Sequence, residues 1–254
     1  MEGSCRGEVP IPAAPVAREP RRSRHKRTRG LVPVATVEQS GLVFVTQDGP
    51  PIAELGPLPT LVPPRFRLLA TTDIDIPANW KVLVEGFLEG YHIRSTHEQT
   101  FFPVQYDNVN VVETFGPNSR IAFPYRSINK LRAVPPAERT VEGTLTYVYV
   151  LFPNAMVATF PGRIVVVAVE PLAVDRTRFV TYTLTDREDE AEERAAVAQG
   201  LSFVEAGARE DRDVACAIQR SLASGANDSF EFGLFEAAIG HFHRTLDAAL
   251  AASA

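Results

Sequence analysis

Two of the chain's five histidines, His92 and His97, lie in one short apolar stretch together with Glu89. Neutral imidazoles and a carboxylate are ligands that suit iron(II), and such a set on one face leaves positions open for dioxygen. Around a regular helix, Glu89 and His92 lie about 60° apart and therefore side by side. His92 and His97 lie about 140° apart on such a helix. If both histidines bind one ion, the helix must loosen or end between them.

The residues around these histidines form a pattern of high specificity. Asn79-Trp80-Lys81 is followed by Glu85-Gly86-Phe87-Leu88-Glu89-Gly90-Tyr91-His92, by His97 and by Tyr106-Asp107-Asn108. This pattern resembles the catalytic domain of the alpha subunit of Rieske-type non-haem iron ring-hydroxylating oxygenases. The resemblance implies that His92 and His97 bind iron(II). It also implies that Glu89 bridges, by hydrogen bonds, to the iron–sulfur cluster of a neighbouring subunit in a homotrimer. The Asn that some members carry at the position of Gly86 is absent here.

A third ligand is expected from the C-terminal third of the chain. The segment from Glu210 to Leu222 is similar to the family's Glu-Asp segment that ends in Gln-Arg-Gly-Leu. By this similarity, Asp211 completes a facial triad with the two histidines. Asp213 is the alternative ligand, and it lies on a different side of the predicted helix.

A second set of potential ligands, Glu236, His241 and His243, lies close to the C-terminus. Their spacing of five and two residues spreads them around a helix, so that no single face presents all three. We interpret them as structural residues.

Composition limits the class of protein. The 254 residues are 45% hydrophobic and carry a net charge of −5, which argues against nucleic acid as a partner. The only cysteines are Cys5 and Cys216, so neither a disulfide framework nor a thiolate zinc site is expected. No apolar run approaches the length of a membrane helix. These features predict a soluble, cytoplasmic protein.

The order of predicted elements indicates an α+β fold. Residues 1–30 are rich in Pro and Arg and are predicted to be a disordered tail, residues 31–64 resemble a remnant of the Rieske domain with a Pro-rich linker, and residues 65–254 are expected to form the catalytic domain. Strands are predicted over 31–34, 41–45, 65–76, 109–115, 120–125, 145–152, 156–160, 164–172 and 178–185, and helices over 79–97, 186–199, 205–221 and 232–251, with a break at Gly200. The resemblance implies a helix-grip (START-like) domain, in which a curved antiparallel sheet wraps around a helix.

The motifs that hold the iron–sulfur cluster in this family are missing. They are Cys-x-His and Cys-x-x-His, and Cys5 is followed by Arg6-Gly7, while no further cysteine precedes Cys216. Three interpretations stay open: the chain is a fragment of a longer protein, it works with a separate cluster-bearing subunit, or it has lost oxygenase activity.

The resemblance implies an oxidoreductase that uses mononuclear iron(II) and dioxygen to hydroxylate, dihydroxylate or demethylate a small substrate such as an aromatic compound. A reductase or ferredoxin would supply the electrons, and the 2Fe-2S cluster would come from a missing domain or a partner chain. Phe87, Phe101 and Phe102 are candidate walls of the substrate pocket. The alternative is a catalytically inactive helix-grip protein that binds a hydrophobic small molecule.

Overall fold

The computed structural model describes residues 34–46, 58–187, 190–227 and 229–253. The predicted tail over 1–30 and most of the predicted strand over 31–34 lie outside these residues. The described chain begins with a hairpin of β1 (Ala35–Gln39) and β2 (Leu42–Thr46). Ser40 and Gly41 join the two strands with φ of 59° and 83°. Two consecutive positive φ values are typical of the turns that match the twist of a β-hairpin.

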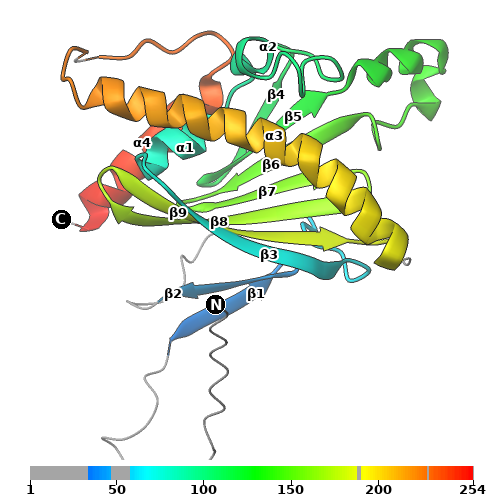
Figure 1. Ribbon diagram of the computed structural model, residues 1–254, viewed down its shortest axis with the longest axis horizontal. Helices are drawn as coiled ribbons and strands as arrows, with labels where there is room; N and C mark the ends of the chain where they lie inside the picture. The colour runs from blue at the N-terminus through cyan, green and yellow to red at the C-terminus, as the bar shows by residue number, and fades with distance from the viewer. Residues whose placement is uncertain (1–33, 47–57, 188–189, 228, 254) are drawn as a thin grey trace, which may run out of the picture.

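The centre of the molecule is a seven-stranded antiparallel sheet with the strand order β3-β9-β8-β7-β6-β5-β4 (Figure 1). Its strands are β3 (Arg67–Ile76), β4 (Val111–Phe115), β5 (Asn118–Pro124), β6 (Leu145–Leu151), β7 (Ala155–Phe160), β8 (Arg163–Ala173) and β9 (Arg176–Thr185). From β4 to β9 each strand pairs with the next one in sequence, and β3 pairs with β9 as the edge strand of the sheet. The predicted succession of strands is therefore confirmed.

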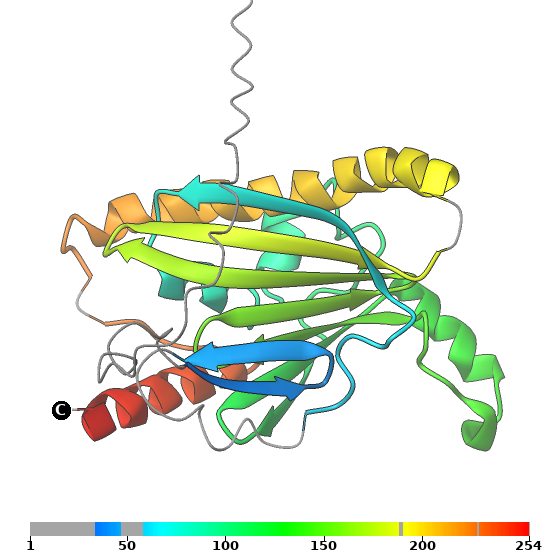
Figure 2. The ribbon, with the colours of Figure 1, turned by 90° about the horizontal axis from the view of Figure 1, so that it is seen from below.

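Helices gather on one face of this sheet, and the hairpin lies on the other (Figures 1 and 2). The α-helices are α1 (Trp80–Glu85), α2 (His92–Thr96), α3 (Glu190–Leu222) and α4 (Ala237–Ser253), and the 3₁₀ helices are η1 (Arg126–Ala133) and η2 (Pro136–Glu138). The mixed helix and antiparallel-sheet architecture agrees with the predicted α+β class. None of the described helices is long and apolar enough to cross a membrane.

The alternation of side chains along β6 explains why both faces of the sheet are covered. Val148 and Val150 point into the core beneath the helices, which also holds Ile121, Leu83 and Phe242. The intervening residues Tyr149 and Leu151 point to the opposite face, where they form a second core with Leu42, Phe44, Leu61 and Phe66 from the segment that precedes β3. Because successive residues of a strand face opposite sides, one strand can contribute to both cores.

Two predictions about the helices differ from the structure. The single helix expected over 79–97 is wrong: α1 ends at Glu85, and α2 begins at His92 after an irregular segment that contains Gly86 and Gly90. The break expected at Gly200 is also wrong, because α3 continues through it. An interior glycine costs a helix only about 1 kcal/mol relative to alanine, which a long helix can tolerate. The predicted helix start at Asn79 is confirmed, since its side chain accepts a hydrogen bond from the Lys81 N–H.

Candidate metal centre

The two ends of the short helix α2 determine how the two histidines are presented. His92 is the first residue of α2, and His97 follows its last residue with φ −102° and ψ 35°. Because His97 leaves the helical conformation, its ring is not bound to the angle that a regular helix would impose on it. The two imidazole rings lie with their centroids 5.0 Å apart and their planes at 69° to each other. The helix was expected to loosen or end if both histidines bind one ion, and α2 indeed ends at Thr96, directly before His97.

Asp211 approaches both rings from α3, far away in sequence. Its Oδ1 lies 2.9 Å from Nε2 of His97 and 3.6 Å from Nε2 of His92. One ligand atom from each of the three residues lies within 4.8 Å of the others, and among the described residues this is the one group of at least three such side chains close enough to share an ion. The predicted triad of His92, His97 and Asp211 is thus brought together in space.

A carboxylate holds the other nitrogen of each ring. Nδ1 of His92 contacts Oε1 of Glu89. The second oxygen of Glu89, Oε2, accepts hydrogen bonds from the backbone N–H groups of Tyr91 and His92. Nδ1 of His97 lies 2.8 Å from Oε2 of Glu210. A carboxylate accepts hydrogen bonds, so in the neutral tautomer that donates from Nδ1 to Glu89 or Glu210 the Nε2 lone pair is left to bind a metal. Histidines that bind metals are commonly oriented in this way.

The contact between His97 and Asp211 fits a site for a cation. The His97 ring is fully buried, and its Nε2 makes no hydrogen bond of acceptable geometry although Asp211 Oδ1 is 2.9 Å away. With Nδ1 protonated, a lone pair and a carboxylate oxygen face each other, and they repel unless a proton or a cation lies between them. Burial lowers the pKa of His97, but the carboxylates of Asp211 and Glu210 outweigh burial and raise this pKa above its ordinary value.

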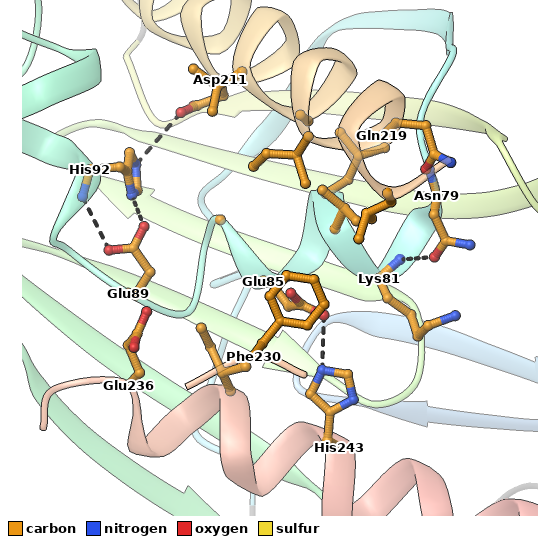
Figure 3. Close-up of a pocket in the computed structure, with 18 of the residues that line it drawn as sticks. Asn79, Lys81, Glu85, Glu89, His92, Asp211, Gln219, Phe230, Glu236 and His243 are labelled. Carbon is orange, nitrogen blue, oxygen red and sulfur yellow. Dashed lines mark hydrogen bonds and ion pairs between the residues drawn. The ribbon is translucent and has the colours of Figure 1, made fainter. Parts of the chain in front are cut away.

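The candidate centre opens into a cavity of about 1300 Å³ between α1, α3, α4 and residues 229–232 (Figure 3). His92 and Asp211 belong to its wall. Further along the wall, Nε2 of His243 lies 2.8 Å from Oε1 of Glu85, and the Phe232 ring stacks on His243 with centroids 6.1 Å apart. The carboxylates of the lining are Glu85, Glu89, Asp175, Asp211, Glu231 and Glu236.

The other candidate residues do not belong to the group of possible metal ligands. Asp213 is exposed on α3 and does not belong to the group around the two histidines. Nε2 of His243 contacts Glu85, and Glu236 accepts a hydrogen bond from the backbone N–H of Gly233, so these two residues have structural partners, whereas the buried Nε2 of His241 has no hydrogen-bond partner among the described residues.

The three phenylalanines expected as pocket walls do not line this cavity. Phe87 packs against the core beneath the helices. Phe101 packs edge-on against His97, and Phe102 lies under the guanidinium of Arg126. Glu210 received no role from the sequence, although it directly precedes the predicted ligand Asp211. An acidic residue on a helix becomes informative only when its partner across the fold is known.

Comparisons with known proteins identify the family and the fold of the chain. Residues 65–252 match the family model described as the ring hydroxylating alpha subunit (catalytic domain). No curated protein matches the chain. Among solved structures, a quaternary ammonium Rieske monooxygenase shares 18% identity at a TM-score of 0.69, over 90% of this chain and 65% of that one. Dicamba monooxygenase bound to dicamba shares 15% identity at a TM-score of 0.57, over 87% of this chain and 71% of that one.

These likenesses establish the fold as the helix-grip domain of Rieske oxygenases. The chain spans about two thirds of the length of the quaternary ammonium monooxygenases that it matches. The family match covers well over half of the chain and includes both histidines and Asp211. The chain therefore belongs to the family of ring-hydroxylating oxygenase alpha subunits, a family of oxidoreductases, through its catalytic domain.

Proposed function

We propose that this chain is the catalytic domain of an iron(II)-dependent oxygenase in which His92, His97 and Asp211 are the metal ligands. The observation that carries the proposal is the convergence of one nitrogen from each of the two histidines and one carboxylate oxygen of Asp211 within 4.8 Å of one another. Two histidines and one carboxylate on one side of an ion are the ligand set of non-haem iron oxygenases. Iron(II) bound to such a set supplies the activation of dioxygen.

The protein's own residues prepare this site. Carboxylates of Glu89 and Glu210 contact the two Nδ1 atoms, and both Nε2 atoms lie on the side of Asp211. The three ligands come from α2, the residue after it, and α3, which leaves the cavity side open for substrate. Fixing open positions and orienting a substrate beside them is the task of the protein in this type of catalysis.

The substrate that we propose is a small organic molecule that is hydroxylated, dihydroxylated or demethylated. The similar structures concern carnitine oxidation and dicamba, two chemically different compounds. The wall of the cavity combines carboxylates with apolar residues such as Phe230, Val214 and Ile218, so it can contact both polar and apolar groups of a substrate.

Electrons must reach the site from a 2Fe-2S cluster outside the residues present here, because the sequence contains neither of the cysteine–histidine pairs that hold it. We propose that Glu89, which lines the cavity and holds His92, faces that cluster in a neighbouring subunit of a homotrimer. A similar solved structure is described in terms of inter-subunit electron transfer. A reductase or ferredoxin is the proposed donor. We also propose that residues 65–254 form the catalytic domain and residues 31–64 a remnant of the Rieske domain.

Metal analysis tests the proposed function. Purified protein loaded with iron(II) under anaerobic conditions and desalted should retain about one iron per chain. His92→Ala should lose that iron while it keeps the far-ultraviolet circular dichroism spectrum of the wild type. A wild-type protein that retains no iron would refute the proposed oxygenase. It would favour the alternative function, a catalytically inactive ligand-binding protein, which would need no cluster motifs.

A further inference from the structure

We propose that Glu210 is a positioning residue for the iron ligand His97, and that Thr100 and Gly207 allow it to act. This inference rests on the proposed function, because it concerns how one ligand is presented to the metal. It assigns a role to a carboxylate that is not itself in the group of ligand atoms: Glu210 meets His97 at Nδ1, on the side of the ring away from Asp211.

One oxygen of Glu210 receives two hydrogen bonds from the segment around His97. Nδ1 of His97 lies 2.8 Å from Oε2 of Glu210, and the hydroxyl of Thr100 donates to the same oxygen at 2.7 Å. Thr100 is only 7% exposed, so water does not compete freely for its hydroxyl. Two donors on one oxygen fix the position of the carboxylate, and the carboxylate in turn fixes the rotation of the His97 ring.

One side of α3 faces His97 and the neighbouring Phe101 because of helix periodicity. Gly207, Glu210 and Asp211 occupy positions i, i+3 and i+4, which lie on one side of a helix. The Phe101 ring lies against the His97 ring at a centroid distance of 4.6 Å and an interplanar angle of 63°. A Cβ at position 207 would lie 2.5 Å from Cε2 and Cζ of Phe101. The glycine therefore leaves room for the aromatic ring that limits tilting of the imidazole.

The two histidines are held in different ways, and this difference is what makes the role of Glu210 specific. Glu89 lies three residues before His92, so that contact forms within one local segment. Glu210 comes from α3, so its contact with His97 depends on the packing of α3 against the turn after α2. Since Asp211 is the next residue of α3, one helical turn supplies a proposed ligand and also orients a second one.

Anaerobic titration of the full chain with iron(II) tests this assignment. Loss of an outer partner of a ligating histidine typically weakens metal binding by about 10–100-fold, and we expect Glu210→Ala to fall in that range. Glu210→Gln keeps an oxygen that can accept the Nδ1–H group and should recover most of that loss. Thr100→Val removes the hydroxyl at nearly constant volume and should weaken binding in the same direction, by less than Glu210→Ala. Asp213→Asn, an exposed change on the same helix, is the matched control.

A second readout separates ring orientation from general loss of structure. Cobalt(II) bound in place of iron(II) should give a visible absorption spectrum that shifts in Glu210→Ala and is unchanged in Asp213→Asn. Without metal, both variants should unfold cooperatively on heating, as the wild type does. If Glu210→Ala does not fold, Glu210→Gln and Thr100→Val carry the test.

Three results decide between the possibilities. Wild-type protein that binds iron(II), with Glu210→Ala within about twofold of Asp213→Asn, would overturn the role of Glu210 and leave the proposed function intact. Complete loss of binding in Glu210→Gln would also overturn it, because Glu210 would then be a ligand. A wild-type chain that binds no iron(II) would refute the proposed function itself.

Discussion

Nε2 of His243 lies 2.8 Å from Oε1 of Glu85, and this contact joins the end of α1 to α4 along the wall of the cavity (Figure 3). Burial raises the pKa of the Glu85 carboxyl above its ordinary value, and the nearby Glu236 adds to the effect, whereas the hydrogen bond from His243 opposes it. The folded protein therefore holds a proton on Glu85 at pH values where the unfolded chain has already lost it.

This shift predicts how stability depends on pH. Between the ordinary pKa of 4.5 and the raised value, the folded state binds more protons at Glu85 than the unfolded state does, so the free energy of unfolding falls as pH rises. Glu85→Gln cannot titrate, and its amide oxygen can still accept a hydrogen bond from His243. We expect the variant to lose this decline, as measured by urea unfolding at several pH values from about 4 to 8. A difference between wild type and variant that stays constant with pH would show that Glu85 does not titrate differently on folding.

The close approach of Gly207 to Phe101 predicts a steric effect. Gly207→Ala should gain up to about 1 kcal/mol of helix propensity. Overpacking should at the same time lower the free energy of unfolding by about 1–3 kcal/mol, because the added Cβ would lie 2.5 Å from the Phe101 ring. The expected result is a net loss of stability and weaker iron binding, since Phe101 packs on His97. Gly207→Ala combined with Phe101→Leu should recover stability in denaturant unfolding. A single variant more stable than the wild type would show that the ring moves aside freely.

The hydroxyl of Thr177 links the sheet to the start of the helix that precedes the candidate centre. It is fully buried on β9 and donates to the backbone oxygen of Ala78 at 2.8 Å. Thr177→Val leaves that oxygen without its donor and should lower the free energy of unfolding by about 1–3 kcal/mol. Thr72→Val on β3 replaces an exposed threonine of the same sheet and is the control. Equal effects of the two changes in urea unfolding would contradict a role for the buried hydrogen bond.

The sequence predicted most strands and the three residues, His92, His97 and Asp211, that the fold brings together, and it did so for a physical reason. Short runs of β-branched and aromatic residues bounded by turn residues indicate strands with little ambiguity, as along β6 and β7. His92 and His97 belong to one local motif of fixed spacing, and Asp211 belongs to a second motif far along the chain. The sequence connects the two motifs only through the family resemblance, whereas the fold brings them together in space.

What the sequence did not predict depends on contacts across the fold. The helix expected through Glu89 ends at Glu85, because Gly86 and Gly90 allow an irregular path that local periodicity does not reveal. Glu210 looks like an ordinary helix carboxylate until α3 is packed against His97. The cavity is lined by residues of α1, α3, α4 and 229–232 and not by the three expected phenylalanines, because local patterns in the sequence do not show which helix covers which part of a sheet.

The measurement that tests the central claim most directly compares two neighbouring carboxylates. Asp211 lies beside both imidazoles, whereas Asp213 is exposed two residues further along α3. After anaerobic loading with iron(II) and desalting, Asp213→Ala should retain about one iron per chain, as the wild type does, and Asp211→Ala should retain none. Equal iron content in the two variants would contradict the assignment of Asp211 as the third ligand and, with it, the proposed metal centre.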